Sequence, residues 1–371
     1  MKNIVLIDHE LFTKRRKTIF MIDKLLNSGY NVEVWDISQI VYPERFYPDE
    51  QKENYVRKIN SLFDLRHLIK GIDVSNVVFI VECFYNWENR KIFKTLSENN
   101  CYIIKLDLYA NTTLKESFFD KLSRIRSEKI LEFFQKRIKV IGLKIYKKIF
   151  NLKNFDRIIS SSDIVYRTDK INHPDYESYI NELGAKPLVS GNYIVFCDIF
   201  FPVHPELLPL FKKQPKQSEY INTLNNFFSF LEEKYKMPVV IAAHPKSDYS
   251  GNEFEGRSII KYSTANLVIN SNMVLQHFSN SVSYCVLADK PILFFITKDM
   301  LELKQSIKYM ELLSKTLGKK IINIDDSISR DLDISRISQS KRVKYIYSYL
   351  TSTETENRFN FDIFNSILSN I

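Results

Sequence analysis

Short apolar strands alternate with amphipathic helices along most of this 371-residue chain, and the alternation runs in two separate series. In the first series, apolar segments of strand length are separated by stretches with helical spacing, such as Thr18–Asn27 and Asn89–Ser97. Strands that alternate with helices predict a parallel sheet covered on both faces. The expected strands of this series are Asn3–Ile7, Asn31–Asp36, Val77–Val81, Tyr102–Leu106 and Arg157–Ser160.

The first series ends where Gly184, Pro187 and Gly191 lie close together, and a second series begins after them. Its expected helices are Ser218–Tyr235 and Val282–Ala288. Its expected strands are Tyr193–Cys197, Val239–Ala243, Leu267–Asn270, Ile292–Ile296 and Ile321–Ile324.

A chain of this length suits two domains of ordinary size. We therefore predict an α/β protein with two Rossmann-like domains that face a cleft. We expect the first domain over residues 1–190 and the second over 191–339, with helices of residues 340–371 packing back on the first domain.

The composition excludes several classes of protein. A content of 44% apolar and 26% charged residues is that of a folded globular chain. The four cysteines are far apart and form no C-x-x-C pair, so neither a zinc site nor a disulfide framework is indicated. No stretch approaches the ~18 uninterrupted apolar residues of a spanning helix. These features predict a cytoplasmic protein.

The segment Val239–Ala243 predicts a buried strand, and it ends in His244-Pro245-Lys246. A histidine at the carboxyl end of a parallel strand lies where open α/β sheets bind ligands. His244 is therefore a candidate for holding a donor phosphate and protonating its leaving oxygen, with Pro245 and Lys246 beside it. A structural histidine at a strand end gives the same pattern, and His173-Pro174 and His204-Pro205 repeat the dipeptide without a preceding strand.

About thirty residues later the chain reads His277-Phe278-Ser279-Asn280-Ser281, before an expected helix. Hydroxyls and free N–H groups at a helix start can bind an anion, so His277, Ser279 and Ser281 are candidates for contacting the phosphate. The same serines could simply cap the helix, and both roles are compatible.

The general base is harder to assign. Asp198 follows the expected strand Tyr193–Cys197 and is followed by apolar residues, an environment that can raise a carboxyl pKa toward that of a base. A carboxylate that only caps the loop is the alternative. Asp8 and Asp107 occupy equivalent strand ends in the first domain and are candidates for the same role.

Positive charge is concentrated in one segment. Between Lys121 and Phe150 there are ten Lys or Arg residues and two Glu, within a net charge of +9 for the chain. Apolar residues recur there at helical spacing, so the segment is either a surface helix packed on one face or a basic amphipathic helix on an anionic membrane. We expect a peripheral contact with the inner face of the cytoplasmic membrane through residues 121–150, and no nucleic-acid partner.

Glycine-rich phosphate loops of the G-x-G-x-x-G and G-x-x-x-x-G-K-[ST] kinds are absent, which argues against a dehydrogenase or a P-loop NTPase. No Asp-x-Asp follows a strand, so we expect no metal and no cofactor.

The pair formed by His244-Pro245 and Ser279/Ser281 on a second α/β domain resembles the His-Pro and Ser motifs of bacterial sialyltransferase-like and Kdo-transferase-like enzymes. These enzymes have the GT-B fold, and the resemblance covers mainly residues 193–295. It implies a metal-independent glycosyltransferase that builds a surface polysaccharide, such as lipopolysaccharide or capsule. His244, Ser279 and Ser281 would then contact the phosphate of a CMP-activated nonulosonate or octulosonate.

The first domain lacks the paired acidic motif of those sialyltransferases, so the resemblance does not supply the base. A UDP-sugar, GDP-sugar or CDP-polyol donor remains an alternative, as does a non-catalytic scaffold that docks on a membrane. The acceptor and the anomeric outcome stay open.

Overall fold

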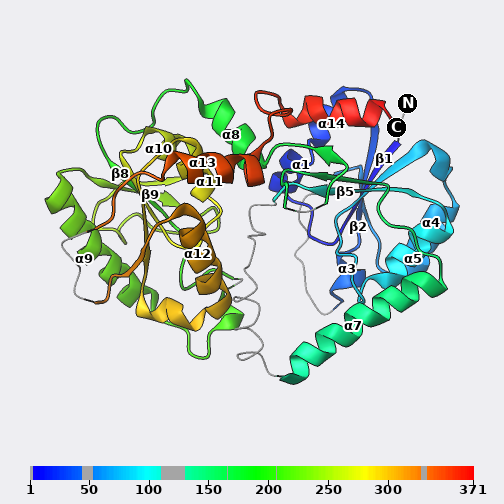
Figure 1. Ribbon diagram of the computed structural model, residues 1–371, viewed down its shortest axis with the longest axis horizontal. Coiled ribbons are helices and arrows are strands. Elements are labelled where there is room, and N and C mark those ends of the chain that lie inside the picture. The colour runs from blue at the N-terminus through cyan, green and yellow to red at the C-terminus, as the bar shows by residue number, and fades with distance from the viewer. Residues whose placement is uncertain (1–2, 44–52, 110–129, 165, 206, 327–331) are drawn as a thin grey trace.

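The computed structural model describes residues 3–43, 53–109, 130–164, 166–205, 207–326 and 332–371, which form two α/β lobes side by side (Figure 1). Each lobe contains one sheet, and every strand pairing in both sheets is parallel. Apolar clusters cover both faces of each sheet. The predicted fold of two Rossmann-like domains is thereby confirmed.

The first sheet has the strand order β3-β2-β1-β4-β5-β6-β7. Its strands are β1 (Asn3–Asp8), β2 (Asn31–Asp36), β3 (Val56–Lys58), β4 (Val77–Val81), β5 (Tyr102–Asp107), β6 (Arg157–Ser160) and β7 (Asp169–Lys170). The helices between them are α1 (Lys14–Ile19), α2 (Ile22–Asn27), α3 (Ser38–Val41), α4 (Leu62–Lys70), η1 (Val74–Asn76), α5 (Arg90–Glu98) and α7 (Ile130–Ile149).

The second sheet has the strand order β10-β9-β8-β11-β12-β13. Its strands are β8 (Ile194–Cys197), β9 (Val239–Ala243), β10 (Ile259–Lys261), β11 (Met273–Gln276), β12 (Ile292–Ile296) and β13 (Ile321–Asn323). The helices of this part are α8 (Pro174–Glu182), η3 (Leu208–Leu210), α9 (Gln217–Tyr235), α10 (Thr264–Asn270), α11 (Val282–Leu287), η4 (Lys298–Glu302) and α12 (Lys304–Leu317).

The central strands are continuous apolar runs because helices bury both of their faces. All five residues of β4 and of β9 are buried. In the first domain, Leu65 of α4 and Phe93 of α5 lie in the cluster on one face of the sheet, and Leu25 of α2 lies in the cluster on the other. Each fully buried side chain of this size contributes roughly 1.5–3 kcal/mol relative to an exposed one.

Two predicted elements are wrong. Leu267–Asn270 is not a strand but the end of α10, and the strand that occupies this place in the sheet is β11. A short apolar run has the same composition in a buried strand and in a buried helix, so periodicity does not distinguish them. The single helix expected over Thr18–Asn27 is two helices, α1 and α2, because Met21 between them has a φ of +55°.

The chain crosses between the lobes more than once. Tyr176 of α8 is buried in the core of the second domain, although α8 precedes residue 190. At the C-terminal end, Tyr345 of α13 (Gln339–Tyr345) and Tyr349 of the π-helical turn Ile346–Leu350 also pack in that core. Only α14 (Asn360–Ser369) packs on the first sheet, through Phe364 and its neighbours. Figure 1 shows this crossing at the top of the molecule.

Candidate functional site

Each sheet has one point where the strand order reverses. In the first sheet it lies between β1 and β4, and in the second it lies between β8 and β11. In open α/β sheets, ligands bind outside the carboxyl ends of the strands at this point. Asp8 and Glu82 flank the reversal in the first sheet, and Asp198 and the Ser279–Ser281 turn flank it in the second. The candidate site is therefore built from two strand edges.

Asp8 is fully buried at the end of β1. Its Oδ1 accepts a hydrogen bond from the backbone N–H of Glu10 at 2.9 Å, and its Oδ2 lies 2.5 Å from Nε of Arg16 on α1. Burial raises the pKa of Asp8, and the charge of Arg16 opposes this shift. Asp8 is thus held in place by a cation, and it shares that cation with Glu10, 2.7 Å from Arg16 Nη1.

Glu82 follows β4 immediately, and its backbone N–H donates to the carbonyl of Ile7 on β1. The residue is partly exposed, but its Oε1 atom is buried and has no hydrogen-bond partner among the described residues. Burial of the carboxyl, together with the nearby charge of Asp8, raises the pKa of Glu82 to about 8. A carboxyl with this pKa can exchange a proton near neutral pH.

Glu82 is not among the site residues predicted from the sequence. The pattern that singled out Asp8 and Asp198, a carboxylate directly after a buried strand, is also present in Val77–Val81 followed by Glu82. Glu82 therefore could have been found by applying the same criterion to every strand.

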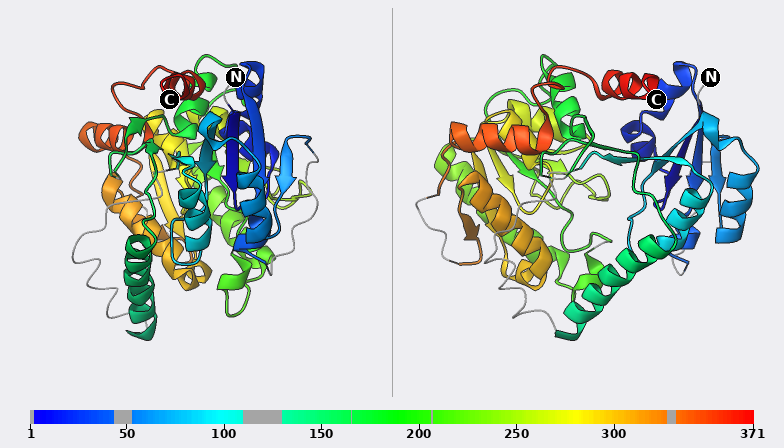
Figure 2. Two further views of the ribbon diagram at one scale, coloured as in Figure 1. Left: turned by 90° about the vertical axis from the view of Figure 1, so that its right-hand side faces the viewer. Right: turned by 45° about the vertical axis from the view of Figure 1, so that its right-hand side comes forward.

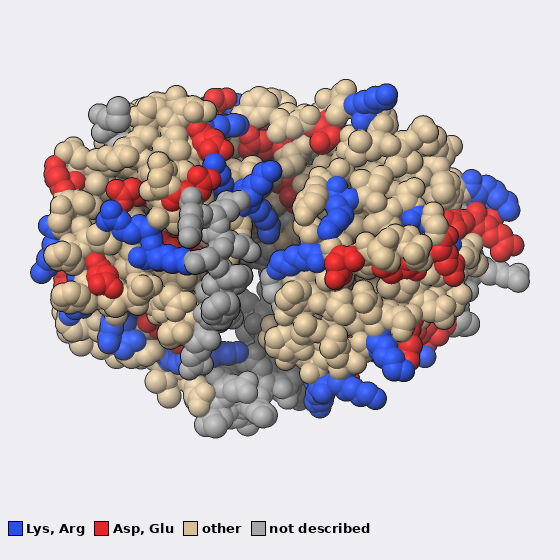
Figure 3. Space-filling view, turned by 180° about the vertical axis from the view of Figure 1, so that it is seen from behind, with Lys and Arg blue, Asp and Glu red and all other residues tan. Residues whose placement is uncertain are grey.

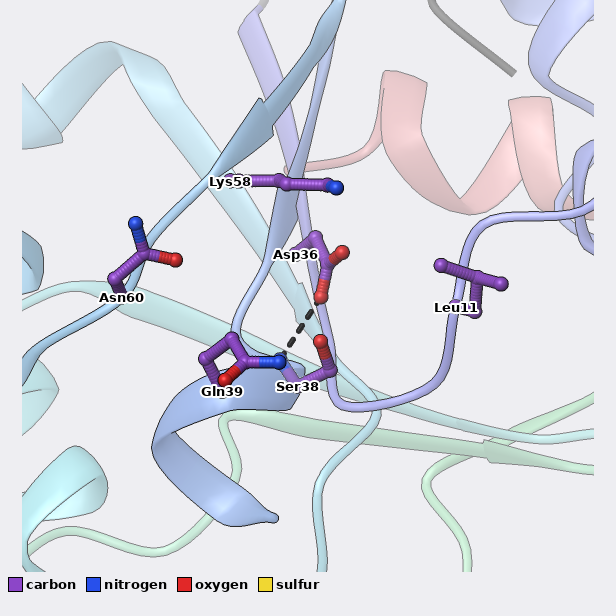
Figure 4. A pocket seen from close by; sticks show the side chains of 6 residues that line it. All are labelled: Leu11, Asp36, Ser38, Gln39, Lys58 and Asn60. Atoms are coloured by element: carbon purple, nitrogen blue, oxygen red, sulfur yellow. Dashed lines mark hydrogen bonds between the residues drawn. The ribbon is translucent and has the colours of Figure 1, made fainter. Parts of the chain in front are cut away.

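Two further carboxylates lie along the same edge. Asp107, a predicted candidate, ends β5 and its Oδ2 accepts a hydrogen bond from the Ser160 hydroxyl at 3.2 Å. Asp36 ends β2, and its Oδ1 accepts from the backbone N–H of Ser38 at 2.8 Å. A small pocket, with a cavity volume of about 30 Å³, opens beside Asp36 (Figure 4). Its lining residues are Leu11, Asp36, Ser38, Gln39, Lys58 and Asn60.

His9 adds an imidazole next to Asp8. Its ring lies between the rings of Tyr42 and Phe84, with centroids 5.9 and 5.7 Å away. Its Nδ1 atom is buried without a hydrogen-bond partner in the described part of the chain, and lies 3.8 Å from Asp8 Oδ1. The reversal point of the first sheet thus holds two carboxyls, an imidazole and a guanidinium.

In the second sheet, Asp198 ties neighbouring strand ends together. Its Oδ1 accepts from the backbone N–H of Phe200 at 2.8 Å, and its Oδ2 accepts from the N–H of His244 at 3.1 Å and the Tyr249 hydroxyl at 3.0 Å. Burial raises the pKa of Asp198, and these three donors oppose the shift. These contacts show that Asp198 holds the strand ends together. Its predicted role as the base is untested.

His244 is half-buried at the end of β9. Its Nδ1 accepts a hydrogen bond from the backbone N–H of Lys246 at 3.1 Å, so the neutral ring carries its proton on Nε2. The ring of His204 packs edge-on against it, with centroids 4.8 Å apart. His204 belongs to one of the His-Pro pairs that no expected strand immediately precedes. Pro245 and Lys246 are exposed beside it.

Ser279 and Ser281 lie on the turn between β11 and α11. Their hydroxyl oxygens are 2.9 Å apart, and Ser279 Oγ accepts from the backbone N–H of Ser281 at 3.3 Å. The next N–H groups, of Val282 and Ser283, already donate to carbonyls of the turn. Because α11 has only six residues, its own contribution to anion binding is small, and the two hydroxyls are what the turn offers a ligand.

His277 does not share this surface. Its side chain is fully buried, its Nδ1 donates to the Phe295 carbonyl at 2.6 Å, and its Nε2 accepts from the Tyr220 hydroxyl at 2.9 Å. Burial lowers its pKa to about 3, so the ring is neutral. The expected contact between His277 and a nucleotide is not supported, because both ring nitrogens are already paired inside the core.

The two strand edges are joined by polar contacts. Tyr284 of α11 donates to Asp175 Oδ1 at 3.2 Å. Asp175 lies two residues after His173, whose ring packs edge-on against Tyr109 just after β5. Arg15 of the first domain donates to the Tyr109 hydroxyl at 3.4 Å. The residues after β5 and those after β11 therefore meet through Asp175 and His173.

The space-filling view from behind shows a hollow between the two lobes, bordered by Lys and Arg side chains (Figure 3). Among the described residues, no three His, Cys, Asp or Glu side chains converge as metal ligands do. The four cysteines, all within that part, are buried and unbridged.

No family model and no curated protein matches this chain. Solved structures that resemble it include the spinosyn forosaminyltransferase SpnP (11% identical, TM-score 0.49, covering 100% of this chain and 99% of that one). MurG of Acinetobacter baumannii (8%, 0.48) and the UDP-GlcNAc 2-epimerase of Methanocaldococcus jannaschii (10%, 0.46) each cover 100% of both chains. All these TM-scores are below 0.5, so neither an activity nor a substrate follows from them.

Proposed function

We propose that the protein is a metal-independent glycosyltransferase that moves a sugar from a nucleotide-activated donor to a surface-glycan acceptor. In this proposal the second domain holds the donor phosphate and the first domain activates the acceptor hydroxyl. The observation that carries it is the position of complementary groups at the two reversal points. Glu82 and Asp8 lie at one, and His244, Ser279 and Ser281 lie along the other sheet's edge.

The donor phosphate would bind to the edge formed by β9, β8 and β11. These strands are adjacent, so the end of β9 and the end of β11 are ~10 Å apart. In this proposal Nε2–H of His244 and the hydroxyls of Ser279 and Ser281 donate to the phosphate oxygens there. As the bond between the anomeric carbon and the phosphate oxygen breaks, the oxygen takes the electron pair, and these donors stabilise its charge.

The acceptor hydroxyl would lose its proton to Glu82. A base is most effective when its pKa is near the working pH, and Glu82 has a pKa of about 8. The hydroxyl oxygen then forms the new bond to the anomeric carbon. Asp8 would act on Glu82 through its charge, whereas Asp198 would hold the loop that carries His244. Glu82 thus replaces Asp198, Asp8 and Asp107 as our preferred base.

For the donor we favour a CMP-activated acidic sugar of the nonulosonate or octulosonate kind. Such a donor has one phosphate, and one imidazole with two hydroxyls matches a single phosphate better than a diphosphate. UDP-sugars, GDP-sugars and CDP-polyols are the alternatives.

The donor is tested by thermal unfolding in the presence of CMP, CDP, UDP and GDP. A nucleotide that binds only the folded protein raises the melting temperature, and at a given concentration the shift is larger for a tighter ligand. We expect CMP to give a shift. A shift with UDP or GDP alone would replace CMP as the donor nucleotide, and no shift with any nucleotide would contradict the proposed function.

The role of His244 is tested with His244→Asn. The Asn side-chain oxygen can still accept the hydrogen bond from the Lys246 N–H, whereas the Nε2–H group is lost. We expect the nucleotide-induced shift and sugar transfer to fall strongly while the melting temperature without ligand stays close to that of the wild type. His67→Asn, at an exposed position on α4, is the matched control and should retain both. Equal transfer by His244→Asn and wild type would exclude a phosphate contact at His244.

A further inference from the structure

Helix α7 carries a stripe of exposed large apolar side chains. Phe134, Ile138, Ile141, Ile145 and Ile149 follow one another at intervals of three or four residues and are 54–69% exposed. In the described part of the chain, seven of the twenty-one exposed large apolar side chains lie within residues 134–150. Residues three and four apart share one face of a helix, so these five side chains form one continuous apolar stripe.

The helix is attached to the first domain by other residues. Gly142 packs against the indole of Trp87, where a Cβ atom would lie 3.1 Å from Cζ3, and the ring of Tyr146 lies edge-on to the same indole. Lys139 forms an ion pair with Glu88 at 2.6 Å. These contacts hold the helix in place through residues outside the stripe, whose five side chains stay more than half exposed. In Figures 1 and 2, α7 projects from the first domain at the bottom of the molecule.

Positive charges border the stripe along one side. Arg137, Lys144 and Lys148 each follow a residue of the stripe by three positions and are exposed. The whole of α7 contains six Lys or Arg residues and one Glu. A helix with an apolar face next to a basic face is the pattern of helices that lie in the interface of an anionic membrane.

We propose that α7 docks the protein on the surface of a bilayer that contains anionic lipid, with the stripe entering the headgroup–acyl boundary. The basic residues beside the stripe would then face the lipid phosphates. A nucleic acid would engage these charges but would leave the stripe in water, and contiguous exposed apolar surface usually marks an interaction site. No helix in the described part of the chain is long and apolar enough to cross a membrane. The proposed contact therefore lies along the membrane surface.

Flotation of the full-length protein with vesicles tests this proposal, independently of nucleotide binding. We expect binding to vesicles of phosphatidylglycerol and phosphatidylcholine, and much weaker binding to phosphatidylcholine alone. Ile138→Ser combined with Ile145→Ser should lower the vesicle affinity about tenfold or more. Lys144→Gln combined with Lys148→Gln should lower it about fivefold for each charge removed, and this effect should shrink in high salt.

Matched controls change equally exposed residues elsewhere. Leu183 and Leu188 are 51% and 55% exposed, and their replacement by Ser should leave vesicle binding unchanged, as should Lys212→Gln combined with Lys213→Gln. Circular dichroism verifies that every variant is folded. Absence of vesicle binding by the wild type, or an equal loss in the controls, would overturn the proposal. So would an apolar α7 variant that converts a dimer to a monomer, since the stripe would then cover a second copy of the chain.

Discussion

The carboxyl groups of Asp8 and Glu82 lie at the ends of neighbouring parallel strands, at the point where the strand order of the first sheet reverses. Asp8 is paired with Arg16, whereas Glu82 Oε1 is buried without a hydrogen-bond partner among the described residues. Burial and the charge of Asp8 raise the pKa of Glu82 to about 8. Two carboxyls in one place thus differ in environment, because Asp8 has a guanidinium against it and Glu82 Oε1 does not, and such differences set carboxyl pKa values apart.

The raised pKa of Glu82 predicts a pH-dependent stability. The folded protein holds this proton up to about pH 8, whereas an unfolded chain releases it near the ordinary glutamate pKa of 4.5. The contribution of Glu82 to stability is therefore fully present below pH 4.5 and is lost as the pH rises toward 8. Glu82→Gln stays neutral, so we expect it to gain on the order of 3–5 kcal/mol relative to the wild type across this interval. Urea unfolding of both proteins at several pH values measures the difference, and parallel pH curves would show that Glu82 is ionised in the fold.

A second prediction concerns activity. If ionised Glu82 accepts the proton of the acceptor hydroxyl, kcat/KM of sugar transfer should rise with pH and level off above about pH 8. Glu82→Gln should lower kcat/KM by about 10²–10⁴ and remove this rise. Because Asp107 lies at the end of the adjacent strand, Asp107→Asn is the matched control and should keep the pH profile. If Asp107→Asn loses the rise with pH and Glu82→Gln keeps it, the base is Asp107 and not Glu82.

Arg16 is predicted to stabilise the fold by neutralising Asp8. Arg16→Met keeps the apolar stem but leaves the buried Asp8 carboxylate without its cation, which should cost about 3 kcal/mol near neutral pH. Asp8→Asn added to Arg16→Met should recover most of this loss, because no buried charge then remains. Chemical unfolding of the two single variants and the double variant gives the coupling energy. Additive losses would mean that the ion pair contributes nothing.

The sequence was sufficient to predict the fold class, because buried parallel strands such as β4 and β9 are uniform apolar runs followed by helical spacing. It was not sufficient where an apolar run is short. Leu267–Asn270 ends a helix, and the strand β11 follows only two residues later. Composition alone does not decide such a case, because tertiary contacts determine which segment enters the sheet.

The sequence was sufficient to place candidate residues at strand ends, but it did not predict which residues distant in the chain contact them. His244 lies at the carboxyl end of β9, as the sequence indicates, but its neighbour His204 comes from a loop whose position depends on the tertiary fold. Asp198 is at its strand end too, yet only its partners His244 and Tyr249 show what its oxygens are bonded to. The sequence indicates that a residue lies at a strand end. Which hydrogen bonds its side chain can still make to a ligand depends on partners from distant parts of the chain.

Asp198 yields a prediction that separates structure from catalysis. Tyr249→Phe removes one hydrogen bond to Asp198 Oδ2 and should cost about 1 kcal/mol of stability, with transfer activity largely retained. Asp198→Asn places an amide N–H₂ against donors at one of its two oxygen positions, so it should cost more, about 2–3 kcal/mol. Urea unfolding and transfer assays on both variants provide the comparison. A stable Asp198→Asn protein without activity would restore Asp198 as the base.

His277 is predicted to be a structural residue, and its buried neutral ring should make the folded protein less stable at acidic pH. Its pKa is about 3 in the fold, whereas the ordinary histidine pKa is 6.5. Its contribution to stability is therefore present above pH 6.5 and is lost as the pH falls toward 3. Tyr220→Phe removes the hydroxyl that donates to His277 Nε2, which should cost about 1 kcal/mol near neutral pH. Nucleotide affinity should be unchanged, because the pair lies inside the core.

Tyr235→Phe, on the same helix α9, is the matched control and should cost less stability than Tyr220→Phe. Urea unfolding measures the stabilities, and nucleotide-induced thermal shifts measure the affinity. Reduced nucleotide affinity in Tyr220→Phe, with Tyr235→Phe unaffected, would show that His277 reaches the ligand after all.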